Sequence, residues 1–163
     1  MMHKYLTPLI VIILDQITKV LAVKHLAAGP VAVLPIFSLV LVHNTGISFG
    51  MFDHAGHMGP LVLTLVEVLI AVFFAAWLAK VDNKYLAVAI GAVIGGALGN
   101  VIDRVRLGAV IDFLDFHLGD LHWPAFNVAD SAICVGIAFV VLDGLFFERK
   151  RLKTDTVSHE KSS

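Results

Sequence analysis

Long apolar stretches separated by short polar segments dominate the chain. Four stretches are long enough to cross the hydrocarbon core of a bilayer as helices, which takes about 20 residues at ~1.5 Å per residue. Asp15 and Lys19 interrupt the first stretch, and Asn100 and Asp103 interrupt the third, whereas the second and fourth are clear. We therefore expect an α-helical integral membrane protein with four transmembrane helices. The expected spans lie at about 5–24, 60–79, 85–105 and 128–147.

A different pattern fills the segment between the first two spans. Residues 31–42 read VAVLPIFSLVLV, a run that is rich in β-branched residues and too short to span a bilayer as a helix. Pro35 also argues against helical structure in this run. We expect strands at the outer face of the membrane here, and we interpret segment 106–127 as the second outer loop.

The basic residues predict the orientation, because Lys and Arg are enriched in short cytoplasmic loops. Most of them fall at the N-terminus, in the short loop between the second and third spans, and after residue 148. With four spans these three places share one side, whereas Lys24, Arg104 and Arg106 fall on the other. We expect both termini to be cytoplasmic and the larger loops, 25–59 and 106–127, to face outward.

The composition supports a membrane protein. The 163 residues are 58% hydrophobic and 15% charged, with a mean hydropathy of +0.88, whereas soluble domains average about 45–50% apolar and about 25% charged residues. The net charge is −1, and no basic stripe suggests nucleic-acid binding. We expect one membrane domain over residues 1–150 and a polar cytoplasmic tail over 151–163.

Glycines recur at four-residue spacing in the third span, at Gly91, Gly95 and Gly99. Small residues at this spacing let helices approach closely in lipid. We interpret this stripe as a helix-packing surface.

Polar residues gather at the outer end of the same span. Gly96, Asn100 and Asp103 share one helix face, and Arg104 follows directly. Such a cluster fits either a helix end that reaches water or a functional site, because ionisable residues within spans are costly and mark functional sites by default.

Three further sets of polar residues leave alternatives open. At the start of the fourth span, Asn127 fits a helix N-cap and Asp130 a carboxylate in the first turn, and neither role excludes catalysis. In the second outer loop, Asp112 and Asp115 have similar apolar neighbours, so the pattern alone does not choose between them. In the first span, Asp15 and Lys19 are spaced to form an ion pair across one helical turn.

Glu67 is a lone acid in the second span. It could be a neutral acid, a partner for Lys19, or a functional group. Together with Asp15 and Lys19 it could also line a path for ions, which makes a small transporter the alternative from a different functional class.

Five motifs in order link these residues to a known family. They are Asp15-Gln16-x-Thr18-Lys19, Asn44-x-Gly46-x-x-Phe49-Gly50, Gly95-Gly96-Ala97-x-Gly99-Asn100-x-x-Asp103-Arg104, Val110-x-Asp112-Phe113 and Pro124-x-Phe126-Asn127-x-Ala129-Asp130. Together they resemble the bacterial lipoprotein signal peptidases, or signal peptidase II, over residues 5–147. One departure is Ser48, where many members carry alanine.

The resemblance implies a membrane aspartic endopeptidase of the bacterial inner membrane, with an outer β-rich cradle and with no metal or other cofactor. It implies cleavage of prolipoproteins just before the diacylglyceryl-modified cysteine, contact with membrane lipid, and inhibition by the cyclic peptide globomycin. The catalytic pair would be Asp112 and Asp130. The supporting positions would be Asp15, Lys19, Asn44, Gly96, Asn100, Asp103, Arg104 and Asn127.

Overall fold

The computed structural model describes residues 3–46 and 58–147. Within this part of the chain, four helices are long and apolar enough to cross a membrane, which agrees with the expected fold class. They are α1 (His3–Leu26), α2 (Met58–Leu78), α3 (Lys84–Leu107) and α4 (Val128–Leu142), the last continuing as a π-helical turn over Asp143–Phe147.

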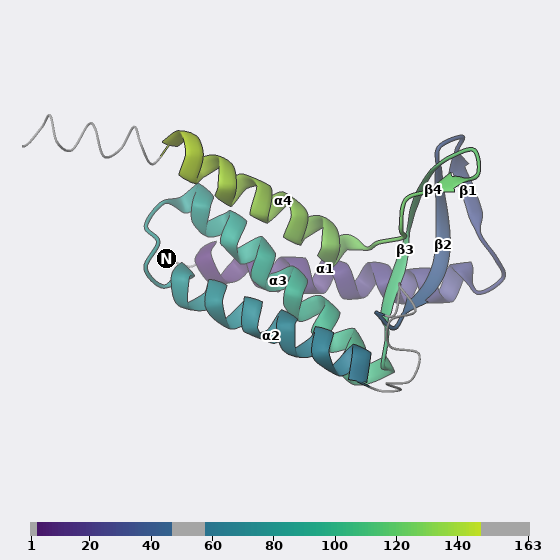
Figure 1. Ribbon diagram of the computed structural model, residues 1–163, viewed down its shortest axis with the longest axis horizontal. Helices are drawn as coiled ribbons and strands as arrows, with labels where there is room; N and C mark the ends of the chain where they lie inside the picture. The colour runs from purple at the N-terminus through teal and green to yellow at the C-terminus, as the bar shows by residue number, and fades with distance from the viewer. Residues whose placement is uncertain (1–2, 47–57, 148–163) are drawn as a thin grey trace, which may run out of the picture.

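Helix α3 is the central helix, and α1, α2 and α4 each pack against it. In its most apolar window 61% of the residues are buried, against 11–17% in the other three helices. The outer helices therefore turn large apolar surfaces away from the protein, as helices bathed in lipid do. The start of α1 and the end of α4 lie at the same end of the bundle (Figure 1).

Close packing around α3 depends on the predicted small-residue surface. A Cβ atom on Gly95 would lie 2.7 Å from the carbonyl oxygen of Pro8 in α1. On Gly96 it would collide with the carbonyl oxygen of Ala129 in α4. Neither position leaves room for a side chain, so the glycine stripe is confirmed as a packing surface, and Gly96 extends it toward α4.

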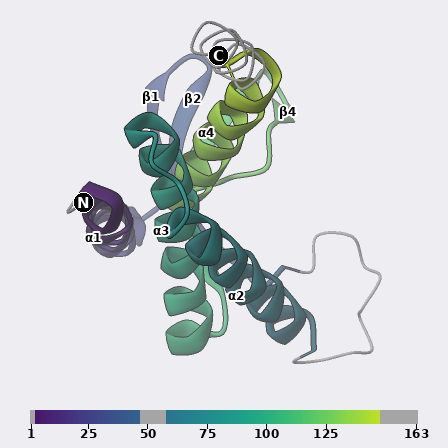
Figure 2. The same ribbon diagram turned by 90° about the vertical axis from the view of Figure 1, so that its left-hand side faces the viewer.

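Four antiparallel strands form a sheet at the opposite end of the bundle from the described chain ends, in the order β1-β2-β3-β4 (Figures 1 and 2). Strands β1 (Val31–Leu34) and β2 (Phe37–Asn44) form an antiparallel hairpin, which confirms the strands expected in residues 31–42. Strands β3 (Val110–Leu118) and β4 (Leu121–His122) come from the segment between α3 and α4.

Strand β3 differs from the expectation of a loop over residues 106–127. The first four residues of β3 are all buried, so the strand has no alternation of apolar and polar positions at its start. Gly108 ends α3 in a left-handed conformation (φ 72°) and turns the chain directly into β3. Helix α3 therefore runs to Leu107, slightly beyond the predicted span.

Candidate active site

Two aspartates from different elements meet where the sheet joins the helical bundle. Asp112 belongs to β3, and Asp130 lies in the first turn of α4. The side chains of Asn127 and Asn100 lie between them and connect one carboxylate to the other. Asn127 Nδ2 donates to Asp112 Oδ1 (2.7 Å) and to Asn100 Oδ1 (3.3 Å), and Asn100 Nδ2 donates to Asp130 Oδ1 (2.8 Å).

Asp112 is held between β2 and the start of α4. Its side chain is almost fully buried, with a residue exposure of 1%. The second oxygen, Oδ2, accepts a hydrogen bond from Asn44 Nδ2 (2.8 Å), which the antiparallel pairing of β2 with β3 brings alongside. Burial raises the pKa of Asp112 to about 6, and the nearby charge of Asp130 raises it as well, while the hydrogen bonds from Asn44 and Asn127 oppose the shift.

Asp130 takes part in the N-terminal cap of α4. The backbone N–H of Asp130 donates to Asn127 Oδ1 (3.0 Å), and the backbone N–H of Asn127 donates to Asp130 Oδ2 (3.2 Å). This reciprocal arrangement is a capping box, which confirms the predicted N-cap and first-turn carboxylate. The cap occupies Oδ2 with a backbone group, so Oδ1 remains the oxygen that faces Asn100.

The orientations of the two bridging amides are determined by their other partners. Lys19 Nζ donates to Asn100 Oδ1 (2.9 Å), and a lysine ammonium has no acceptor capacity, so the NH₂ group of Asn100 must point to Asp130. The oxygen of Asn127 is likewise fixed by the N–H of Asp130. Each oxygen of both carboxylates thus accepts one N–H donor, which suits a pair that carries negative charge.

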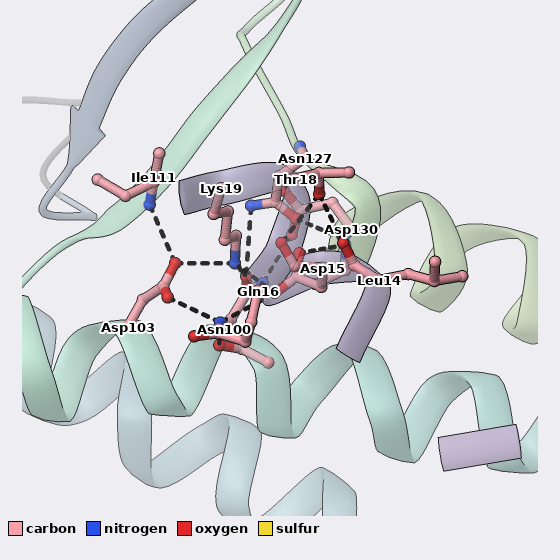
Figure 3. Close-up of polar contacts among 12 residues, drawn as sticks. Leu14, Asp15, Gln16, Thr18, Lys19, Asn100, Asp103, Ile111, Asn127 and Asp130 are labelled. Carbon is pink, nitrogen blue, oxygen red and sulfur yellow. Dashed lines mark hydrogen bonds and ion pairs between the residues drawn. The ribbon is translucent and has the colours of Figure 1, made fainter. Parts of the chain in front are cut away.

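Lys19 is the hub of a buried network behind this pair (Figure 3). Its ammonium forms ion pairs with Asp15 Oδ2 and Asp103 Oδ2, both at 2.8 Å. The predicted pairing of Asp15 with Lys19 is therefore confirmed. Asp15 and Asp103 are each 0–4% exposed in their side chains, so the lysine neutralises charges that could not remain buried alone.

The same two carboxylates fix the backbone beside each aspartate of the pair. Asp15 Oδ1 accepts the backbone N–H of Ala129 (2.9 Å), next to Asp130. Asp103 Oδ2 accepts the backbone N–H of Ile111 (3.2 Å), next to Asp112. One network thus holds β3 and the start of α4 at a set separation, which is how preorganised sites are built.

Two further charged residues have partners of their own. Arg104 forms an ion pair with Glu67 of α2 at 2.5 Å, so Glu67 does not pair with Lys19. Asp115 pairs with His122 Nδ1 at 2.9 Å. The geometry therefore separates Asp112, which joins the network of Asp130, from Asp115, which does not.

The structure brings together most of the predicted site residues: Asp15, Lys19, Asn44, Asn100, Asp103, Asp112, Asn127 and Asp130, with Gly96 at the contact of α3 with α4. Ser48 and the tail 151–163 lie outside the described residues. Gln16 is a member of the network that the prediction lacks, since its Nε2 donates to Asp103 Oδ1 (2.9 Å). Its place beside Asp15 in the first motif was the available signal.

The arrangement suits acid–base chemistry. Two carboxylates that share a hydrogen-bond network do not ionise equally, because the first negative charge opposes the second. A pair of this kind holds one proton between its members over a range of pH, and it presents both a base and an acid to a bound molecule. In the described part of the chain, no group of three or more His, Cys, Asp or Glu residues is placed to hold a metal ion.

Comparisons with known proteins identify relatives of this chain. The family described as signal peptidase (SPase) II matches residues 7–146. A lipoprotein signal peptidase of Paraburkholderia phymatum is 46% identical over 138 residues, covering 83% of each chain. A second, from Acinetobacter baumannii, is 43% identical over 145 residues, covering 87% of this chain and 82% of the relative.

Solved structures with a similar fold are also known. Two structures described as bacterial membrane enzymes superpose with TM-scores of 0.75 and 0.71, at 28% and 27% sequence identity. The first alignment covers 88% of this chain and 92% of the other, and the second covers 87% of both.

Proposed function

The chain belongs to the signal peptidase II family, and from this premise we propose that Asp112 and Asp130 are the catalytic pair of a membrane aspartic endopeptidase. The observation that carries the proposal is the bridge from Asp112 through Asn127 and Asn100 to Asp130. Family membership supports the removal of signal peptides from prolipoproteins, whereas the proposed chemistry rests on the residues themselves.

In the proposed reaction the pair begins with one proton. The ionised carboxylate accepts a proton from a water molecule as the water oxygen attacks the scissile carbonyl carbon. The protonated carboxyl donates a hydrogen bond to the carbonyl oxygen, and then a proton to the amine as the C–N bond breaks. Because the pair titrates jointly, the two roles belong to the pair and are not divided between Asp112 and Asp130.

The amides of Asn100 and Asn127 support this reaction by holding the carboxylates without competing for their proton. An amide NH₂ group donates only, and it has no titration in the working range. A lysine donating directly to the pair would instead favour two ionised carboxylates. Lys19 is one residue removed, behind Asn100, and there it orients the amide.

The proposed substrate is a prolipoprotein cut just before its diacylglyceryl-modified cysteine. The pair lies at the sheet end of a bundle whose outer helices expose apolar side chains over most of their surfaces. At that depth the two acyl chains remain in lipid while the peptide bond reaches water and the carboxylates. The distribution of Lys and Arg supports an extracytoplasmic site and cytoplasmic termini in the bacterial inner membrane. We also expect inhibition by the cyclic peptide globomycin, because the chain belongs to the signal peptidase II family.

The transporter alternative has less support. Asp15 and Lys19 are bound to each other and to Asp103, and Glu67 is bound to Arg104. These groups satisfy one another in the described part of the chain, so they are not left free to pass an ion along the bundle.

The test is cleavage of a synthetic prolipoprotein peptide with and without diacylglycerol on its cysteine, by purified protein in lipid. We expect a cut directly before the modified cysteine, located by mass spectrometry, and little turnover of the unmodified peptide. Equal cleavage of both peptides would contradict the proposed substrate. A cut at another bond would contradict the proposed register of the substrate at the site.

A further inference from the structure

Glu67 is a charged residue that the proposed mechanism does not use. It lies within α2, where a carboxylate surrounded by apolar residues is costly. Its side chain is only 16% exposed, and its partner Arg104 is 7% exposed. Helix α2 packs chiefly against α3, so this ion pair is a polar connection across the interface of the two helices.

The ion pair is adjacent to the proposed catalytic pair. Arg104 lies one helical turn after Asn100, whose amide donates to Asp130. Three charged groups from three different helices lie within electrostatic reach of the Glu67 carboxylate: Arg104 of α3, Asp130 of α4 and Lys19 of α1. The nearest of these is Arg104, which binds it directly. Asp130 is a like charge within electrostatic reach of Glu67, which connects the ion pair to the aspartate pair.

Arg104 carries an unused donor. Among the described residues its Nε–H has no hydrogen-bond partner, although the atom is fully buried. A guanidinium has five N–H donors in a rigid plane, and buried ones are almost always satisfied. Because Glu67 binds Nη1, it fixes the plane of the guanidinium and with it the direction of the free Nε–H.

We propose that Glu67 is a positioning residue of the peptidase, which orients the guanidinium of Arg104 beside the aspartate pair and balances its positive charge. The proposal rests on the proposed two-aspartate function. Without Glu67, the positive charge of Arg104 would be uncompensated near the pair and would favour its doubly ionised, inactive form. The guanidinium would also lose the contact that fixes its plane.

The test compares kcat and KM for the diacylglyceryl-modified peptide between about pH 5 and pH 9, a range that includes the pKa of about 6 for Asp112. The variants are Glu67→Gln, Glu67→Asp and the exchanged pair Glu67→Arg with Arg104→Glu. Asp143→Asn is the control, because Asp143 is also a buried acid but lies at the far end of α4. Folding of each variant is followed by its thermal unfolding in lipid.

We expect Glu67→Gln to lower kcat/KM about ten-fold, because the amide oxygen can still accept from Arg104 but no longer forms a charge-assisted hydrogen bond with it. The alkaline limb of its rate profile should move to lower pH by roughly half a unit or more, because a like charge near the pair has been removed. Glu67→Asp keeps the charge, so it should keep the position of that limb. Asp143→Asn should keep the wild-type limb as well.

The exchanged pair separates positioning from a purely structural connection. It restores an ion pair between α2 and α3 but moves the positive charge to the other helix, so we expect a folded protein with low activity. Wild-type activity in the exchanged pair, or an unshifted profile in Glu67→Gln, would overturn the proposal. If Glu67→Gln does not fold, the activities of the exchanged pair and of Glu67→Asp test the proposal in its place. Full activity of Asp112→Asn would instead overturn the two-aspartate function itself.

Discussion

Replacing Asp112 by asparagine should abolish cleavage and at the same time remove a source of instability. Burial raises the pKa of Asp112 from 3.8 to about 6. Each tenfold change in a protonation equilibrium corresponds to about 1.4 kcal/mol, so keeping this buried side chain ionised costs about 3 kcal/mol relative to an exposed aspartate. The cost is present in the wild type at about pH 8 and absent in the variant.

The dependence on pH has a definite sign. Well above about pH 6, Asp112 is ionised in both the folded and unfolded states, and the folded state bears the full cost. As the pH falls from about 6 to 3.8, the folded state takes up a proton that the unfolded state does not yet bind, so the wild type gains stability. The asparagine side chain of the variant does not titrate, and all other groups are common to both proteins. The stability of the wild type relative to the variant should therefore rise by up to about 3 kcal/mol between about pH 8 and pH 4.

The assay is thermal unfolding of both proteins in the same detergent at about pH 8, 6 and 4.5, followed by tryptophan fluorescence. In the variant, an NH₂ group replaces one of the two Asp112 oxygens that accept hydrogen bonds from Asn44 and Asn127. This lost hydrogen bond lowers the free energy of unfolding by about 1–3 kcal/mol at every pH. That constant loss cancels in the change with pH, which is the quantity to compare. A difference in unfolding temperature that stays constant with pH would show that burial does not penalise the charge of Asp112. A wild type that loses stability relative to the variant as the pH falls would show that the sign of the pKa shift is wrong.

Three further substitutions follow from individual contacts. Lys19→Met should lower stability by about 3–5 kcal/mol, measured by unfolding in detergent, because it leaves two buried carboxylates without a counter-charge; retention of wild-type stability would show that the network is not buried as described. Gly96→Ala should lower the free energy of unfolding by about 1–3 kcal/mol, because the added methyl group forces α3 away from α4. Gly144→Ala is the control and should be neutral, because its methyl group would meet open space. Equal unfolding temperatures of the two variants would contradict the close approach of α3 and α4. Asn44→Ala should raise the pKa of Asp112 further, because it removes a hydrogen-bond donor to the ionised carboxylate. The alkaline limb of the kcat/KM profile should therefore move to higher pH. A shift of that limb to lower pH would mean that Asn44 does not stabilise the ionised carboxylate.

The helices could be predicted from the sequence because lipid-facing helices require long apolar stretches, and nothing else in the chain produces them. Strand β3 could not be predicted in the same way. Its first residues are covered on both faces, so neither the alternation of a half-exposed strand nor the length of a span marks it. The strands in residues 31–42 were recognisable because Pro35 and the β-branched residues argue against a helix there.

The candidate site shows a similar division. Spacing along one helix predicted the pairing of Asp15 with Lys19, since those contacts are local. The choice between Asp112 and Asp115 depends on which face of β3 meets α4 and which meets His122, and this is a property of the sheet register. The pairing of Glu67 with Arg104 depends on how α2 rotates against α3, so no spacing within either helix indicates it.

The two-aspartate proposal is tested most directly by the rates at which Asp112→Asn, Asp130→Asn and Asp115→Asn cleave the diacylglyceryl-modified peptide. Asp115 is the matched control, because it is a buried aspartate of the same strand but pairs with His122. We expect no detectable cleavage by the first two variants and near wild-type cleavage by the third, with all three folded. Cleavage by either Asp112→Asn or Asp130→Asn at the wild-type rate would contradict the assignment of the catalytic pair.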